Sequence, residues 1–147
     1  MAQTDLLDSV KDLLTTNWNI SNTASRTPSI SNIFENKRID FVMGGSTDHI
    51  LLYEDSQDAV DGASGGGIKH KVNIITIDVR TMHNRAQGIL IRNEIERIIV
   101  ANEVNPFSSD PFYDIADVTS LQDLSDKSVK LYRFVLKLKL ERFTQTF

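Results

Sequence analysis

Few side chains in this 147-residue sequence could carry out chemistry. There is no cysteine, so thiolate nucleophiles, thiolate metal sites and disulfides are all excluded. The three histidines, His49, His70 and His83, lie far apart and match no metal-binding spacing. The patterns of a serine-hydrolase elbow, a phosphate-binding loop, a dinucleotide-binding loop and a zinc protease are also absent. The sequence therefore predicts no catalytic residue, no cofactor and no metal.

The triplet Asp78-Val79-Arg80 is the strongest challenge to that view. An acid and a base one residue apart on a strand resemble part of a metal-dependent nuclease, with Asp40 on another predicted strand as a further acid. Such an enzyme needs a second well-placed acid for the cation and a lysine near the attacking water. Arginine stays protonated and cannot act as the base. A structural salt bridge at Asp78 is favoured, and a small nuclease is the enzymatic alternative.

A glycine run, Gly65-Gly66-Gly67, is followed by Ile68-Lys69 and invites comparison with a phosphate-binding loop. Such a loop follows a strand and opens a helix, which lets backbone N–H groups approach the anion. This run instead follows an acidic segment and precedes a predicted strand. We interpret it as a flexible tether.

Seven charged residues are the candidate contacts with other subunits or partners. Four acids fall in the segment 54–67, which has too little apolar surface to pack and is predicted to be a mobile loop. Three basic residues recur on one face of a predicted strand and could meet DNA phosphate, an acidic neighbour or only solvent. A nucleic-acid-binding module is disfavoured by the net charge of −4. The acids are Glu54, Asp55, Asp58 and Asp61, and the basic residues are Arg133, Lys137 and Lys139.

Two amphipathic helices are predicted. The first covers residues 5–16, with Thr4 as its N-cap and with leucine and valine recurring at helical spacing. The second covers residues 85–101, where Ile91, Ile95, Ile98 and Ile99 share one face. Between the first helix and the strands, residues 17–36 are rich in Ser, Asn and Thr, which indicates a long irregular connection.

Alternating apolar residues predict the strands. Two short strands are expected at 39–43 and 49–53, a long one at 68–81, and a closing hairpin made of a strand within 113–121 and a long strand at 129–143. Within 68–81 the alternation changes phase near Ile74, so we expect a bulge there or burial on both faces. The predicted fold is α+β: residues 1–147 form a single domain with a mainly antiparallel sheet and two helices packed on one side.

No apolar stretch approaches the roughly 18 residues that a membrane span needs, and no basic segment followed by an apolar run begins the chain. We therefore expect the protein to stay in the cytoplasm where it is made, without a membrane partner.

Two segments carry a family resemblance. A long strand that enters a helix through a short polar break, and a closing hairpin strand, resemble the central unit and the last hairpin of tail-terminator and tail-completion proteins of tailed phages and archaeal tailed viruses. The first reads VNIITIDVRTMHNRAQGILIRNEIERIIVANEVNPF and the second DLSDKSVKLYRFVLKLKLERF. With the first helix, the resemblance covers most of the chain. The acidic glycine-rich segment and the connection 17–36 depart from it.

The resemblance implies a structural virion protein without enzymatic activity. Such a subunit would form a ring, commonly a hexamer, at the head-proximal end of the tail. The ring would end the tail tube, bind the tail tube protein and the head–tail connector protein, and let viral DNA pass without sequence readout. A head-completion or connector protein is the alternative of the same structural class. Assembly would take place in the host cytoplasm.

Overall fold

A computed structural model describes residues 5–33, 48–61, 68–108, 112–126 and 131–145. Two α-helices and a short 3-10 helix accompany five strands. In chain order these are α1 (Leu6–Asn17), η1 (Ile20–Thr23), β1 (Ser29–Ile33), β2 (Asp48–Asp61), β3 (Ile68–Thr81), α2 (Arg85–Ala101), β4 (Ile115–Asp123) and β5 (Tyr132–Gln145).

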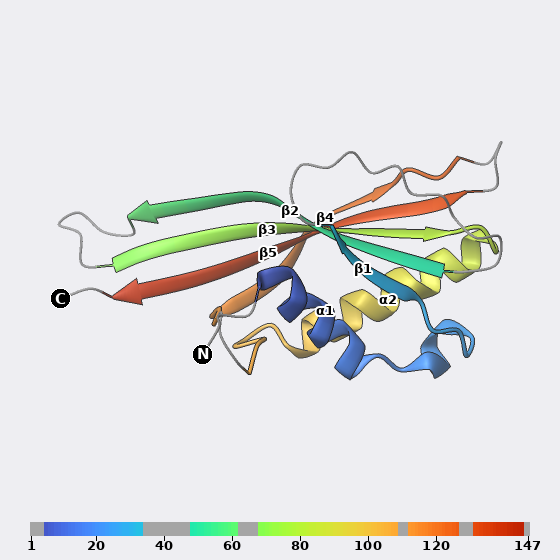
Figure 1. The fold of residues 1–147 in the computed structure, drawn as a ribbon, viewed down its shortest axis with the longest axis horizontal. Helices are drawn as coiled ribbons and strands as arrows, with labels where there is room; N and C mark the ends of the chain where they lie inside the picture. Colours follow the sequence, from blue (N-terminus) through green and yellow to red (C-terminus); the bar gives the residue numbers. More distant parts are fainter. Residues whose placement is uncertain (1–4, 34–47, 62–67, 109–111, 127–130, 146–147) are drawn as a thin grey trace.

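The five strands form one sheet in the order β1-β2-β3-β5-β4. Only β1 and β2 are parallel, and the other three pairings are antiparallel. Figure 1 shows α1 and α2 on the same side of the sheet, where their apolar faces close a single core. The predicted α+β fold, with a mainly antiparallel sheet and both helices on one side, is confirmed.

Helix α1 begins one residue later than expected. Its N-cap is Asp5, whose carboxylate accepts a hydrogen bond from the backbone N–H of Leu7 at 2.9 Å, and the predicted cap, Thr4, lies outside the described residues. An aspartate here also suits the positive end of the helix dipole. The buried face of α1 consists of Leu7, Ser9, Val10, Leu13 and Leu14.

Helix α2 has the predicted bounds and the predicted buried face. Asn84 caps its N-terminus by accepting a hydrogen bond from the backbone N–H of Gln87 at 2.7 Å. The four isoleucines at 91, 95, 98 and 99 are fully buried in the core. Gly88 lies so close to the sheet that an added Cβ would stand 2.6 Å from the Phe134 ring. The absence of a side chain at Gly88 therefore lets α2 rest on β5.

Strand β3 shows the expected two-sided burial, whereas the bulge near Ile74 lies on its neighbour, β2. Ile75 pairs with Glu54 and Ile74 pairs with Ser56, so Asp55 is an extra residue on β2. Beyond this bulge Ile75, Ile77 and Val79 face the core, while Thr76 and Asp78 are buried on the opposite face. Burial on both faces therefore explains the phase change, because β3 itself pairs with β5 without interruption.

Two predictions about connecting segments are wrong. Residues 54–61 belong to β2 and pair with β3, so the predicted mobile loop 54–67 does not hold for them; the remainder, 62–67, lies outside the described residues. The connection 17–36 contains η1 and β1, and β1 adds a parallel edge strand beside β2. The strand predicted at 39–43 also lies outside the described residues.

The closing hairpin is formed by β4 and β5. Strand β4 lies at the sheet edge opposite β1, and its pairing with β5 is interrupted by a second bulge, where Thr119 is the extra residue between Val118 and Ser120. The start of β4 is also paired with the segment after α2, through a bridge between Val104 and Ile115.

Candidate functional site

The three basic candidate residues lie on one face of β5, as the alternation predicts, but each is held within its own subunit. Arg133 contacts Asp78, Lys137 donates to the Thr76 hydroxyl at 2.7 Å, and Lys139 contacts Glu141 at 2.8 Å. These contacts lie on the face of the sheet away from the helices, because Leu136 and Leu138 between them point into the core. As partner contacts, the three basic residues stay predictions.

Asp78 forms the structural ion pair that was predicted, with two arginines rather than one. Its fully buried carboxylate accepts from Arg80 Nη2 at 2.9 Å and from Arg133 Nη2 at 2.9 Å and Nε at 3.0 Å. The hydrogen bonds with Asp78 raise the pKa of Arg133. Asp40 lies outside the described residues. Within the described residues no group of three or more His, Cys, Asp or Glu side chains could hold a metal ion.

The four acidic candidate residues lie along β2 instead of in a loop. Glu54 accepts a hydrogen bond from Asn73 Nδ2 at 2.7 Å, and the Tyr113 hydroxyl donates to Asn73 Oδ1 at 2.8 Å. Burial raises the pKa of Tyr113, and the nearby Glu54 charge adds to the effect. Asp55 is the bulge residue, and the register places Asp58 opposite Val72 and Asp61 opposite Lys69. Strand β3 lies between the strand that carries these four acids and the strand that carries the basic trio.

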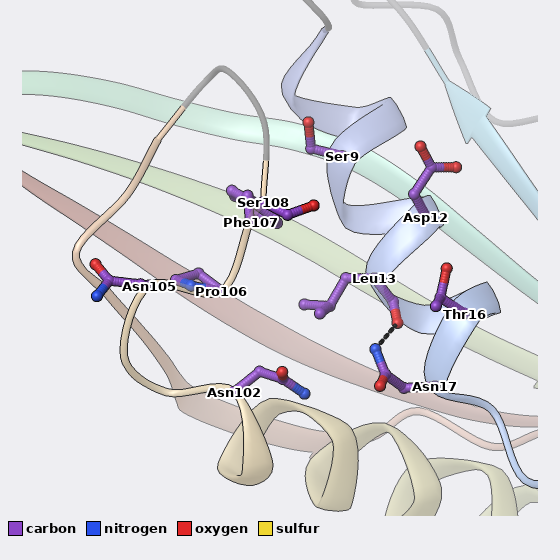
Figure 2. Close-up of a pocket in the computed structure, with 10 residues that line it drawn as sticks. All are labelled: Ser9, Asp12, Leu13, Thr16, Asn17, Asn102, Asn105, Pro106, Phe107 and Ser108. Atoms are coloured by element: carbon purple, nitrogen blue, oxygen red, sulfur yellow. Dashed lines mark hydrogen bonds between the residues drawn. The ribbon is translucent and has the colours of Figure 1, made fainter.

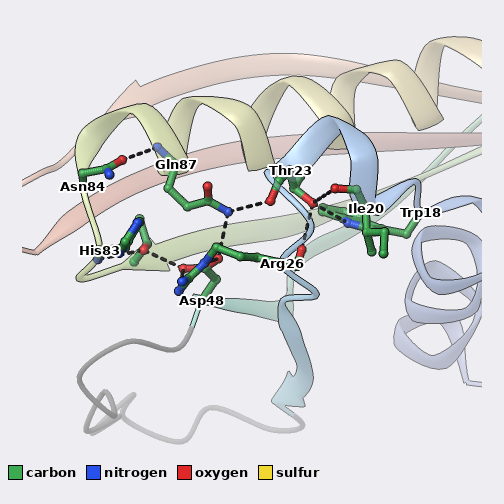
Figure 3. Close-up of polar contacts among 9 residues, drawn as sticks. Trp18, Ile20, Thr23, Arg26, Asp48, His83, Asn84 and Gln87 are labelled. Carbon is green, nitrogen blue, oxygen red and sulfur yellow. Dashed lines mark hydrogen bonds and ion pairs between the residues drawn. The ribbon is translucent and has the colours of Figure 1, made fainter.

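A buried carboxylate that the sequence analysis did not single out, Asp48, joins four segments (Figure 3). Its carboxylate accepts from Arg26 Nε at 2.9 Å, from the Thr81 hydroxyl at 2.7 Å and from Gln87 Nε2 at 3.0 Å. Gln87 Nε2 also donates to the Thr23 carbonyl at 3.1 Å. The segment after η1, the start of β2, the end of β3 and the first turn of α2 are thereby fastened at one point.

Electrostatics at Asp48 follow from two opposed effects. Burial alone would raise the pKa of this carboxyl group, since only 2% of the residue is exposed. Hydrogen bonds from Arg26, Thr81 and Gln87 outweigh the burial, so the pKa lies below its ordinary value. Asp48 is therefore a charged, fully paired acid at neutral pH, and it is a poor general base.

Glu94 fastens the same polar segment from the other side. It accepts from the backbone N–H of Asn19 at 2.7 Å, from Asn22 Nδ2 at 2.9 Å and from Arg97 Nε at 2.6 Å. Burial opposes ionisation here too, but these hydrogen bonds prevail and lower the pKa of Glu94. Arg97 in turn donates to the last carbonyl of α1, at Asn17.

A polar groove of about 360 Å³ separates α1 from the segment that follows α2 (Figure 2). Its floor is apolar, and its rim carries hydroxyl, amide and carboxylate groups. Asn102, at the end of α2, donates its side-chain N–H to the Ile98 carbonyl at 2.8 Å. The lining residues are Ser9, Asp12, Leu13, Thr16, Asn17, Asn102, Asn105, Pro106, Phe107 and Ser108.

The buried acids among the described residues join segments of the fold. The three buried acids, Asp48, Asp78 and Glu94, are each paired with arginine. A carboxylate held in this way neither binds a cation readily nor accepts a substrate proton. The described surface has a groove, exposed charged side chains and strands that extend beyond the helices, and these are features that could contact other proteins.

Comparison with solved structures identifies a chain with a similar fold. A solved chain described as "Virion of native gene transfer agent (GTA) particle" is similar over 95% of this chain and 95% of its own length, with a TM-score of 0.63 and 10% sequence identity. At that identity the likeness shows a shared fold. No protein-family model and no curated protein matches the sequence. Among the described residues no helix is long and apolar enough to cross a membrane.

Proposed function

We propose that this chain is a structural protein of a tailed virus particle, and that its subunits form a ring that terminates the tail tube and joins the tail to the head connector. The observation that carries the proposal is the full-length likeness to a chain of a gene transfer agent virion. That likeness covers 95% of both chains rather than a short common substructure. The tail-terminator resemblance of the sequence supports the same broad class, a structural virion protein.

The chemistry of the described residues supports a structural role. The buried acids join segments of the fold, and the basic residues of β5 contact acids or a hydroxyl of the same subunit. The proposed partners are copies of the chain itself in a hexameric ring, the tail tube protein and the head–tail connector protein, with viral DNA passing through without sequence readout. The proposed location is the head-proximal end of the tail. A head-completion or connector protein is the second candidate, since the same virion likeness supports it.

The first test is the mass of the assembled protein. We expect purified chain, at tens of micromolar, to give the mass of a closed ring by light scattering and native mass spectrometry, because head-to-tail contacts that close form rings. Images of particles carrying a tagged copy should then place the ring between tail tube and connector. A tag inside the head vertex would favour the connector role. A monomer at every concentration, with no ring in particles, would refute the proposal.

The second test concerns enzymatic activity. We expect no DNA cleavage by the wild-type protein with magnesium, manganese or zinc, because Asp78 is buried between Arg80 and Arg133. The variant Asp78→Asn should also be inactive, and it should unfold at a lower temperature since both arginines lose a charged partner. Metal-dependent cleavage by the wild type that disappears in Asp78→Asn would favour the nuclease alternative instead.

A further inference from the structure

The end of β2, the start of β3 and the end of β5 project beyond the helices, as Figure 1 shows on the side where the chain ends. Asn73 and Leu140 form the last cross-strand pair covered by the core, and the next pair on the same, helix-facing side is Lys71 with Arg142. We call this region the sheet end, and define it by Lys71 on β3 and by Arg142 and Phe143 on β5. Its two cations stand directly opposite each other, and like charges in that position destabilise a strand pair.

The described residues provide no ion-pair partner for either cation of the sheet end. Their backbones pair within the sheet, but in the described part of the chain neither the Lys71 nor the Arg142 side chain forms a hydrogen bond or an ion pair, and the Arg142 charge acts only to oppose the rise in the pKa of Tyr113 that burial causes. By contrast, Arg26, Arg97 and Arg133 all contact carboxylates. Two adjacent unpaired cations favour an anionic partner that lies outside the subunit.

Phe143 adds an apolar element to the sheet end. It follows Arg142 on β5, so its ring points to the opposite face of the sheet, where 47% of the residue is exposed. Exposed aromatic side chains beside cations are typical of protein contacts rather than of phosphate-backbone contacts. The anion is therefore more consistent with a protein surface than with DNA.

The groove beside α1 has charged and apolar groups that complement those of the sheet end. Asp12 is exposed at its rim and has no ion-pair partner among the described residues, and none of the ten lining residues is Lys or Arg. The adjoining end of α2 carries no basic residue in its last turn and is capped by the neutral Asn102, so it favours a nearby cation. The floor, which includes Leu13 and Phe107, suits an apolar side chain.

We propose that the sheet end of one subunit docks against the α1 groove of a second copy of the chain. Lys71 and Arg142, which share one face of the sheet, would face Asp12 and the end of α2. This inference rests on the proposed ring, for which it names the subunit contact. Because the two surfaces are different, the contact runs head to tail and can be repeated until the ring closes.

A charge exchange tests the contact by measuring assembly with light scattering at low and high salt. We expect Lys71→Glu with Arg142→Glu, and separately Asp12→Lys, to weaken assembly roughly tenfold or more. The triple variant should assemble again, since every contact then has reversed but matching charges. Wild-type assembly should weaken as salt is raised.

A neutral pair of substitutions separates assembly from folding. Lys71→Gln with Arg142→Gln removes the like-charge repulsion, so the subunit should unfold at the same or a higher temperature while its assembly weakens. If all the charge variants form the same rings as the wild type, and equally readily, the proposed contact is overturned but the proposed function is not. A wild type that never assembles would overturn both. If the Glu variants still assemble but bind DNA more weakly than the wild type, Lys71 and Arg142 contact DNA phosphate instead, and the proposed subunit contact is overturned.

Discussion

Replacing Asp48 with alanine is expected to lower the free energy of unfolding by about 3–5 kcal/mol at pH 7, the cost of breaking a buried ion pair by removing one partner. The substitution removes the carboxylate that pairs with Arg26, leaves the Thr81 hydroxyl without its acceptor, and leaves Gln87 only the Thr23 carbonyl. Four segments lose their common attachment together, so the effect should exceed that of a single hydrogen bond. Urea unfolding followed by circular dichroism measures it.

The same variant gives a pH dependence whose sign is fixed by the structure. The pKa values of Asp48 and Glu94 are both lowered in the folded state, so the unfolded chain binds protons first as the pH falls. Their stabilisation is complete above the ordinary carboxyl pKa and disappears as the pH falls through the lower folded values. Wild type and Asp48→Ala should therefore converge in stability from about pH 4 downward.

Asp123 provides a matched control for Asp48. It also pairs with an arginine, Arg85, at 2.9 Å, but its side chain is 40% exposed and that of Arg85 is 50% exposed. Surface pairs of this kind contribute between zero and about 1 kcal/mol. Asp123→Ala should accordingly have little effect. Equal losses for the two variants, or an Asp48→Ala loss below about 1 kcal/mol, would contradict the attachment role of Asp48.

Truncation of Ile95 to alanine is the second large effect, with an expected loss of about 2–5 kcal/mol. Ile95 is fully buried on the face of α2 that packs against the sheet, together with Ile91, Ile98 and Ile99. Alanine removes apolar contacts and leaves a cavity that the tightly apposed strands cannot close. Thermal and denaturant unfolding should both report the loss without a change in helix content before the transition.

Val100→Ala is the control on the same helix. Val100 is 63% exposed, so its truncation should change stability by less than about 0.5 kcal/mol. A small loss for Ile95→Ala, similar to that of Val100→Ala, would mean that this face of α2 is not packed as described.

Much of the fold follows from periodicity. Apolar residues at helical spacing predicted both helices, and α2 has the predicted bounds, because sheet burial selects one helix face. Glu94 was detectable on the same grounds, since its position between Ile91 and Ile95 places it on the buried face of α2. A buried acid implies a fixed cation, and Arg97 supplies it. Asp48 gave no such signal, because its partners come from segments that are distant in sequence.

The acidic part of β2 was mispredicted for a physical reason. Local composition favours solvation for a segment containing Glu54, Asp55, Asp58 and Asp61, and composition takes no account of a partner strand. The long strand β3 offers a continuous ladder of backbone hydrogen bonds, and its register places Lys69 opposite Asp61. Tertiary pairing therefore prevailed over local preference. Strand β1 is explained in the same way: it is short and largely polar, and it forms a strand because it pairs with β2.

The bulge at Thr119 bears on how many copies can join. An outer strand with a regular hydrogen-bonding edge invites further strands and, in the extreme, fibrils without a fixed number of members. In β4 the extra residue interrupts the regular pairing, and exposed Asp117 and Asp123 flank the interruption. Strand addition along the whole of β4 is thereby disfavoured. The number of subunits in an assembly is then set by contacts between side-chain surfaces that lie at a defined angle to each other. Such contacts give a closed particle with a fixed number of subunits rather than an open-ended fibre.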